Sequence, residues 1–103
     1  MRKKRTKALA ISPRVKEAVW ERDGGRCIVC GSPNAAPNAH YIARSHGGLG
    51  IEENIATLCH DCHRIFDFGV AGEQETIGKI LRAHFKIHYP DWDDDNLIYR
   101  KGF

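Results

Sequence analysis

The chain has 103 residues, a mass of 11.6 kDa and a formal net charge of +3. This length allows one domain with a modest core, and no stretch is apolar and long enough to span a membrane. Five of the sixteen basic residues lie within the first seven positions, so the rest of the chain is slightly acidic. This basic N-terminal arm, residues 1–11, suits a polyanionic partner, although a solvated terminus without function explains the charge equally well.

The first predicted element is a short helix after the arm. Ser12 can cap this helix, Pro13 fits its first turn, and the pair Gly24-Gly25 ends it. The four apolar residues before it, Ala8 to Ile11, are too few for a secretory signal. A cytoplasmic location, where cysteines stay reduced, is therefore expected.

Two short strands and a helix are predicted in the middle of the chain. We expect residues 31–38 to form a loop, residues 39–42 a strand, and residues 55–58 a second strand. The connection between the strands contains Gly47, Gly48 and Gly50 and should be flexible. A helix over residues 61–68 follows and ends at Gly69.

The last third of the chain is predicted to be a helix and a tail. The helix runs from about residue 73 to residue 88, before Pro90, and its apolar face contains Ile77, Ile80, Leu81 and Phe85. The tail, residues 92–103, is too apolar to remain free in water, so we expect it to fold back onto the core.

Four cysteines form two C-x2-C pairs separated by 28 residues: Cys27, Cys30, Cys59 and Cys62. Each pair can place two thiolates on one Zn²⁺ ion with little strain, and two pairs complete a tetrahedral site. Because a closed site leaves no position for water or substrate, this zinc is expected to stabilise the fold without doing chemistry. Disulfides and a redox role are the competing interpretations.

A second group of polar residues lies around the second cysteine pair: His40, Asn54, His63 and Asp67. His63 and Asp67 are four residues apart in the predicted helix, so their side chains share a face and could bind a second ion. Such pairs are also common on ordinary helix surfaces. His40 lies in the first predicted strand, within reach of that face.

Together these motifs resemble the zinc-knuckle branch of the HNH endonucleases. The resemblance runs from Cys27 to Asp67 and comprises the C-x2-C pair, the stretch AHYIARSHGG, Asn54 and the stretch LCHDCH. It implies an α+β fold with a ββα-metal (His-Me finger) core at about residues 27–68. A four-cysteine zinc site would stabilise this core. The core would belong to a single HNH nuclease domain, residues 12–103, with flanking N- and C-terminal helices.

The resemblance also implies an activity, the metal-dependent hydrolysis of DNA phosphodiester bonds. His40 would be the general base that activates water, Asn54 would orient that base or bind metal, and His63 would bind the catalytic divalent ion, Mg²⁺ or Mn²⁺ or another. Asp67 stands where some members carry a further ligand. The stretch GGLGIEEN resembles small proteins of bacteriophages and prophages, which implies DNA as substrate, phage packaging proteins as partners and a bacterial host cytoplasm as the location.

One position departs from the family pattern. Ala39 stands where many members have an aspartate or histidine that binds the metal. The ion would then rest on His63 and Asp67 with waters and phosphate, assisted by Asn54 or by Glu52 or Glu53. This departure keeps an alternative open, a non-catalytic zinc-ribbon-like module that binds DNA or protein.

Basic residues near the predicted site are candidates for phosphate contacts. Arg44 and Arg64 are the only arginines or lysines between Cys27 and Asp67. We predict that they contact DNA phosphates, although surface arginines paired with acidic neighbours are an equally good interpretation. The arm would contribute further contacts from Arg2, Lys3, Lys4 and Arg5.

Overall fold

The computed structural model describes residues 2–100, and the side chains of residues 5–100. At its centre is an antiparallel two-stranded sheet of β1 (Ala35–His40) and β2 (Ile55–Cys59). Strand β2 continues directly into α3 (His60–Phe68), so the three elements form a ββα unit. This arrangement confirms the predicted α+β class and is that of the ββα-metal fold.

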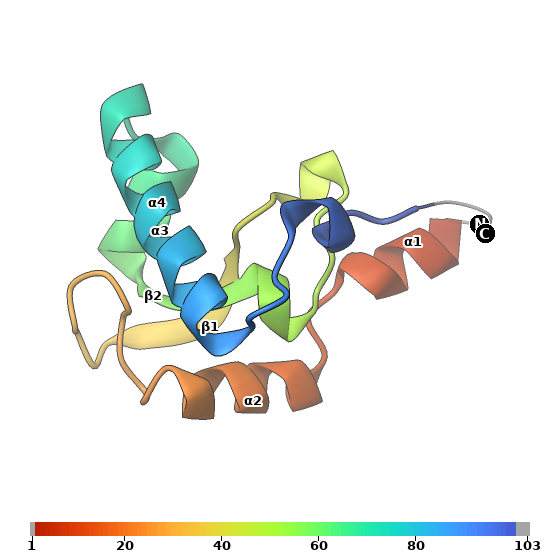
Figure 1. Ribbon diagram of the computed structural model, residues 1–103, viewed down its shortest axis with the longest axis horizontal. Helices are drawn as coiled ribbons and strands as arrows, with labels where there is room; N and C mark the ends of the chain where they lie inside the picture. The colour runs from red at the N-terminus through yellow and green to blue at the C-terminus, as the bar shows by residue number, and fades with distance from the viewer. Residues whose placement is uncertain (1, 101–103) are drawn as a thin grey trace.

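Two further helices cover this unit. Helix α2 (Pro13–Arg22) packs against both strands, and α4 (Ala71–His88) lies along α3. In Figure 1 α2 runs below the sheet, whereas α3 and α4 rise from its other side. The predicted cap is present, because the backbone N–H of Val15 donates to Ser12 Oγ at 3.2 Å.

The N-terminal segment is a helix in the structure. Helix α1 (Arg2–Leu9) contains the basic residues of the arm and ends in Leu9, whose side chain is only 2% exposed. It lies at the opposite end of the molecule from α4 (Figure 1). The buried end of α1 means that the arm is joined to the body by packing as well as by the chain itself.

Strand β1 differs from the strand predicted over residues 39–42. It begins at Ala35, inside the segment predicted to be a loop, and ends at His40, inside the predicted strand. The pairing shifts between Ala36 and Ala39, so Pro37 lies in an irregular part of the ladder where its missing N–H costs no regular hydrogen bond. Local turn residues suggested a loop, but pairing with β2 outweighs that preference.

The glycine-rich connection is also different from the prediction, because it is held by hydrogen bonds rather than flexible. Gly47, Gly48 and Gly50 are buried. The carbonyl of Gly47 accepts from the N–H of Tyr99 at 2.8 Å, and the N–H of Gly50 donates to the carbonyl of Ala8 at 3.0 Å. The connection is therefore fixed between the N-terminal helix and the C-terminal tail.

The core is formed where α4 packs on the sheet and α3. Ile77, Leu81 and Phe85 of α4 are at most 6% exposed and cluster with Leu58 and with Ala39 and Ala56. Each large side chain buried in this way contributes about 1.5–3 kcal/mol. Ile80, predicted to lie on the same face, is 37% exposed, because it points to the edge of the apolar stripe.

The tail folds back as predicted over its described part. Trp92 packs against the core cluster, and Leu97 in the short 3-10 helix Asp94–Leu97 is 1% exposed. Residues 101–103 of the predicted tail lie outside the described residues. No described helix is long and apolar enough to cross a membrane.

A buried ion pair connects α2 to the rest of the fold. Arg22 donates to Asp23 through two nitrogens at 2.7 and 3.0 Å and also to the carbonyls of Glu52 and Ile55 at 2.7 Å. Asp23 accepts from the N–H of Thr57 at 2.9 Å and lies 2.6 Å from His84 Nε2. Although burial opposes ionisation of Asp23, the hydrogen bonds from His84 and Arg22 keep its pKa well below the ordinary value.

Candidate metal centres and active site

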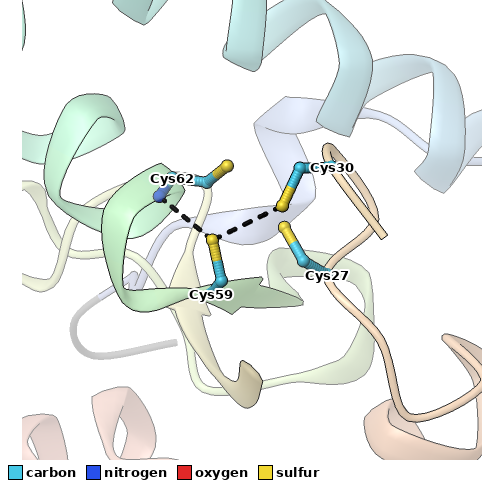
Figure 2. Close-up of side chains that lie close together, drawn as sticks. All are labelled: Cys27, Cys30, Cys59 and Cys62. Carbon is cyan, nitrogen blue, oxygen red and sulfur yellow. Dashed lines mark hydrogen bonds between the residues drawn. The ribbon is translucent and has the colours of Figure 1, made fainter. Parts of the chain in front are cut away.

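The four cysteines converge from two tight turns. Their Sγ atoms all lie within 4.8 Å of one another, and those of Cys30 and Cys59 are 3.6 Å apart. Figure 2 shows the four side chains pointing toward a common centre. A tetrahedral zinc site with Zn–S bonds of about 2.3 Å separates the sulfurs by roughly 3.8 Å. All four thiols are free, so the arrangement fits a structural zinc ion and contains no disulfide.

Local backbone geometry makes this convergence possible. Gly31 has a φ of +80° and donates to the carbonyl of Cys27 at 2.8 Å, which closes the first turn. At the second turn, Cys59 precedes α3 and its Sγ accepts from the N–H of Cys62 at 3.4 Å. Each cysteine pair is therefore shaped by its own turn, as the spacing predicted.

The electrostatics of the four thiols also favour a bound cation. Burial raises the pKa of the Cys27 thiol, but backbone N–H groups from Cys30, Cys59 and Val29 outweigh it and lower the pKa to about 7. Burial and the neighbouring sulfurs instead raise the pKa of Cys62 above the ordinary range for a thiol. Four crowded thiolates repel one another, so full ionisation requires a positive ion at the centre.

A second candidate centre lies beside the first. His40 on β1 and His63 and Asp67 on α3 line one open hollow of about 420 Å³. His63 Nε2 lies 3.2 Å from Asp67 Oδ2, and the two side chains are 30% and 41% exposed. Among the described residues only the four cysteines form a group of three or more potential ligands close enough to share one ion. The second centre thus offers two adjacent ligands and an open approach.

His40 is partly buried at the edge of this hollow. Its Nε2 lies 2.9 Å from the carbonyl oxygen of Leu9 at the end of α1. Burial lowers the pKa of His40 below its ordinary value, the Leu9 carbonyl opposes that shift, and the nearby positive charge of Arg44 reinforces it. The imidazole is therefore neutral near pH 7, the state that a general base requires.

Asn54 is not exposed to the hollow. It is fully buried, its Oδ1 accepts from the N–H of Ile42 at 2.8 Å, and its Nδ2 donates to the carbonyls of Ile42 and Leu49 at 3.1 and 2.8 Å. Every hydrogen-bonding group of the amide is close to a backbone partner. Asn54 thus ties the connection between the strands to the start of β2 and has no free oxygen for a metal ion.

The other ligand candidates are also engaged elsewhere. Ala39 is fully buried and pairs with Ala56, so its side chain belongs to the core. Glu52 Oε1 accepts from the Tyr89 hydroxyl at 3.2 Å, and neither Glu52 nor Glu53 lines the hollow. The residues that face the hollow from β1 are instead Asn38 and His40, two positions apart on the strand.

The basic residues are distributed unevenly around the hollow. Arg44 lines it, whereas Arg64 is 67% exposed and its nearest acidic partner, Asp61, is 4.0 Å away. A second hollow of about 550 Å³ is also lined by His40 and Asp67, and Lys79 of α4 lies in its wall. The sequence alone did not indicate Lys79, because only the packing of α4 against α3 carries it to this surface.

Two further residues of the hollow were not predicted from the sequence. Phe68 at the end of α3 is 84% exposed and lines the hollow with His40 and His63. Asn38 is exposed on β1. The alternation of side chains along a strand would have identified Asn38, had the strand been predicted to begin before residue 39.

These features define the class of protein: a ββα-metal fold with a structural four-cysteine centre and an adjoining polar hollow. In agreement, residues 27–65 match the family model described as HNH endonuclease. No curated protein and no solved structure matches the chain. The matched segment contains all four cysteines, His40, Asn54 and His63.

Proposed function

We propose that the chain is a metal-dependent endonuclease that hydrolyses DNA phosphodiester bonds. The observation that carries the proposal is the shared hollow of His40, His63 and Asp67, in which a neutral imidazole faces a histidine–carboxylate pair. A structural zinc module has no need of that combination. The match to the HNH family supports a nuclease as the class of enzyme.

In the proposed mechanism His40 takes a proton from a water molecule, which then attacks the phosphorus atom. His63 and Asp67 would hold a divalent ion, Mg²⁺ or Mn²⁺, and Arg44 would contact the phosphate. When bound, such an ion neutralises charge on the phosphate and on the leaving oxygen. Attack in line with the 3′ oxygen leaves 5′-phosphate ends.

The ligand set supports a loosely bound ion. His63 and Asp67 provide two ligand atoms, so water and substrate oxygens would complete the coordination. Affinity for the ion would then rise when DNA is present. We also propose, from the resemblance to phage and prophage proteins, that the substrate is phage DNA in the bacterial host cytoplasm and that packaging proteins are partners.

The proposal is tested by incubating zinc-loaded protein with supercoiled plasmid and Mg²⁺ or Mn²⁺. Wild type should cut the plasmid, and His40→Ala should fold and retain zinc while losing about 10²–10⁴-fold in rate, the usual contribution of a general base. Asp67→Ala should fold and require a higher metal concentration. A folded His40→Ala protein that cuts like wild type would disprove the assignment of the base.

The same assay decides the alternative function. If wild type cuts neither plasmid nor single-stranded DNA with any divalent ion, the chain is better described as a non-catalytic zinc module that binds DNA or protein. A filter-binding or mobility assay with the same plasmid then shows whether this module binds DNA, and a negative result leaves protein as the partner.

A further inference from the structure

We propose that the end of helix α1 is a positioning element of the active site, because the Leu9 carbonyl holds His40 with its proton on Nε2. This inference rests on the proposed function and assigns a catalytic task to a helix outside the matched segment, residues 27–65. The basic arm, predicted either to contact DNA phosphates or to be a solvated terminus, would then also position the base.

The chemistry of the contact determines which ring nitrogen of His40 carries the proton. His40 Nε2 and Leu9 O are 2.9 Å apart, and a carbonyl oxygen can only accept a hydrogen bond. Nε2 must therefore carry the proton in the neutral ring. The second nitrogen, Nδ1, is then the one with a lone pair, and it is the nitrogen that can accept a proton from water.

The position of Leu9 explains why its carbonyl is free to accept. The last carbonyls of a helix have no partner within the helix, and Leu9 is the last residue of α1. His40 satisfies this carbonyl, and the N–H of Gly50 satisfies that of Ala8 at 3.0 Å. The side chain of His40 and the N–H of Gly50 thus complete the C-terminus of α1.

The contact also favours the charged form of His40 that appears during the reaction. When Nδ1 accepts a proton, the ring becomes positive while Nε2–H still donates to Leu9. A carbonyl at the negative end of a helix stabilises that charge. The arrangement orients the base and stabilises its conjugate acid, as the aspartate does in a serine protease triad.

Close packing holds the end of α1 in place. Leu9 is 2% exposed, and Gly50 lies against residues 8–10 without room for a side chain. A Cβ atom at Gly50 would overlap the carbonyl oxygen of Ala10 and approach that of Leu9 at 3.0 Å. An alanine at position 50 must therefore push the backbone of residues 8–10 away from its present position.

The first test measures the proton directly in the zinc-loaded wild-type protein. Two-dimensional ¹H–¹⁵N spectra, with His40 assigned by comparison with His40→Ala, should show Nε2 protonated, Nδ1 unprotonated, and the Nε2 proton close to Leu9. A proton on Nδ1, or rapid averaging between the two tautomers, would overturn the proposal. This readout does not depend on cleavage, so it separates failure of this inference from failure of the proposed nuclease function.

The second test uses Gly50→Ala with Gly72→Ala as the matched control. Gly72 is exposed in the first turn of α4, and a Cβ atom there meets nothing within 4 Å. Gly50→Ala should lose the Nε2 proton signal and reduce kcat about tenfold or more with little change in KM, because general-base catalysis depends on orientation. Gly72→Ala should match wild type in both.

The outcomes of the second test are distinct. A folded Gly50→Ala protein that has lost the Nε2 signal but keeps the wild-type kcat would refute a positioning role for α1. Loss of kcat together with the signal would support it. Should Gly50→Ala fail to fold, the wild-type spectrum still decides the tautomer.

Discussion

The two candidate metal centres share helix α3 but are built in different ways. The cysteine centre contains four sulfurs within 4.8 Å of one another, and three of the four residues are buried. The neighbouring hollow contains one adjacent pair, His63 and Asp67, with His40 across from it on β1. One short helix thus contributes to two arrangements: a closed cluster of four sulfurs, and an open hollow in which a histidine–carboxylate pair faces a second histidine.

The difference also appears in how the residues are positioned. Each cysteine pair is shaped by a tight turn between neighbours in the sequence. His40 instead contacts the carbonyl of Leu9, 31 residues away, and its strand continues into a loop that is tied by Asn54. Each half of the closed centre is therefore a local structure, whereas the open hollow requires contacts between distant segments.

Removal of zinc should have the largest effect. Cys59→Ser removes a ligand from the closed centre and should leave the chain largely unfolded, because structural zinc supplies on the order of 10 kcal/mol of folding free energy. Circular dichroism and the zinc content per chain measure the result. His60→Ala is the control, since the His60 side chain is 90% exposed within the same turn. A well-folded, zinc-free wild type would contradict the prediction.

A further carboxylate in the open hollow should bring its ligand set closer to that of the closed centre. Asn38→Asp adds a carboxylate on the face that already contains His40, so it should lower the metal concentration needed for half-maximal cleavage. Ala39→Asp places the carboxylate in the core instead, where an unpaired buried charge costs about 3–5 kcal/mol.

Urea denaturation and metal titration of both variants test this contrast. The family pattern alone suggests that Ala39→Asp restores a missing ligand, whereas the burial of Ala39 predicts a loss of stability. A stable Ala39→Asp protein with improved metal affinity would show that position 39 does reach the hollow.

The pH dependence of cleavage should report the protonation of His40 in the open hollow. Burial and the positive charge of Arg44 lower the pKa of His40, while the Leu9 carbonyl and Asp67 oppose them. Since only the neutral imidazole accepts a proton, the rate should fall as the pH drops through this lowered pKa. Cleavage at pH 6.5 should therefore remain above half of its plateau.

The pH–rate profile can be checked with one charge change. Arg44→Gln removes a positive charge that lowers the pKa of His40, so the acidic midpoint should move upward. A wild-type midpoint above pH 6.5, or a downward shift in Arg44→Gln, would contradict the assigned electrostatics.

The smallest effect is expected from the charges of α1. Its five basic residues would neutralise about five phosphates, which corresponds to a slope of roughly −4 to −5 in log affinity against log salt. Replacing all five with glutamine should flatten the slope by about that amount. Lys86→Gln, an exposed change on α4 outside both hollows, serves as a single-charge control. An unchanged slope would mean that α1 does not contact DNA.

The sequence by itself determined the local features of this protein. The spacing of the cysteines predicted a four-sulfur centre, Ser12 and Pro13 predicted the start of α2, and the interval between His63 and Asp67 predicted a shared helix face. These features depend on turns and caps a few residues long. For that reason their geometry follows from residues that are neighbours in the chain.

Only the tertiary structure decided the features that join distant segments. The pairing of β1 with β2 moved the strand start to Ala35, and the termini fixed a glycine-rich connection that should otherwise be flexible. Packing also buried Ala39 and brought Leu9 to His40. Such contacts depend on how whole elements come together, and no short stretch of sequence contains that information.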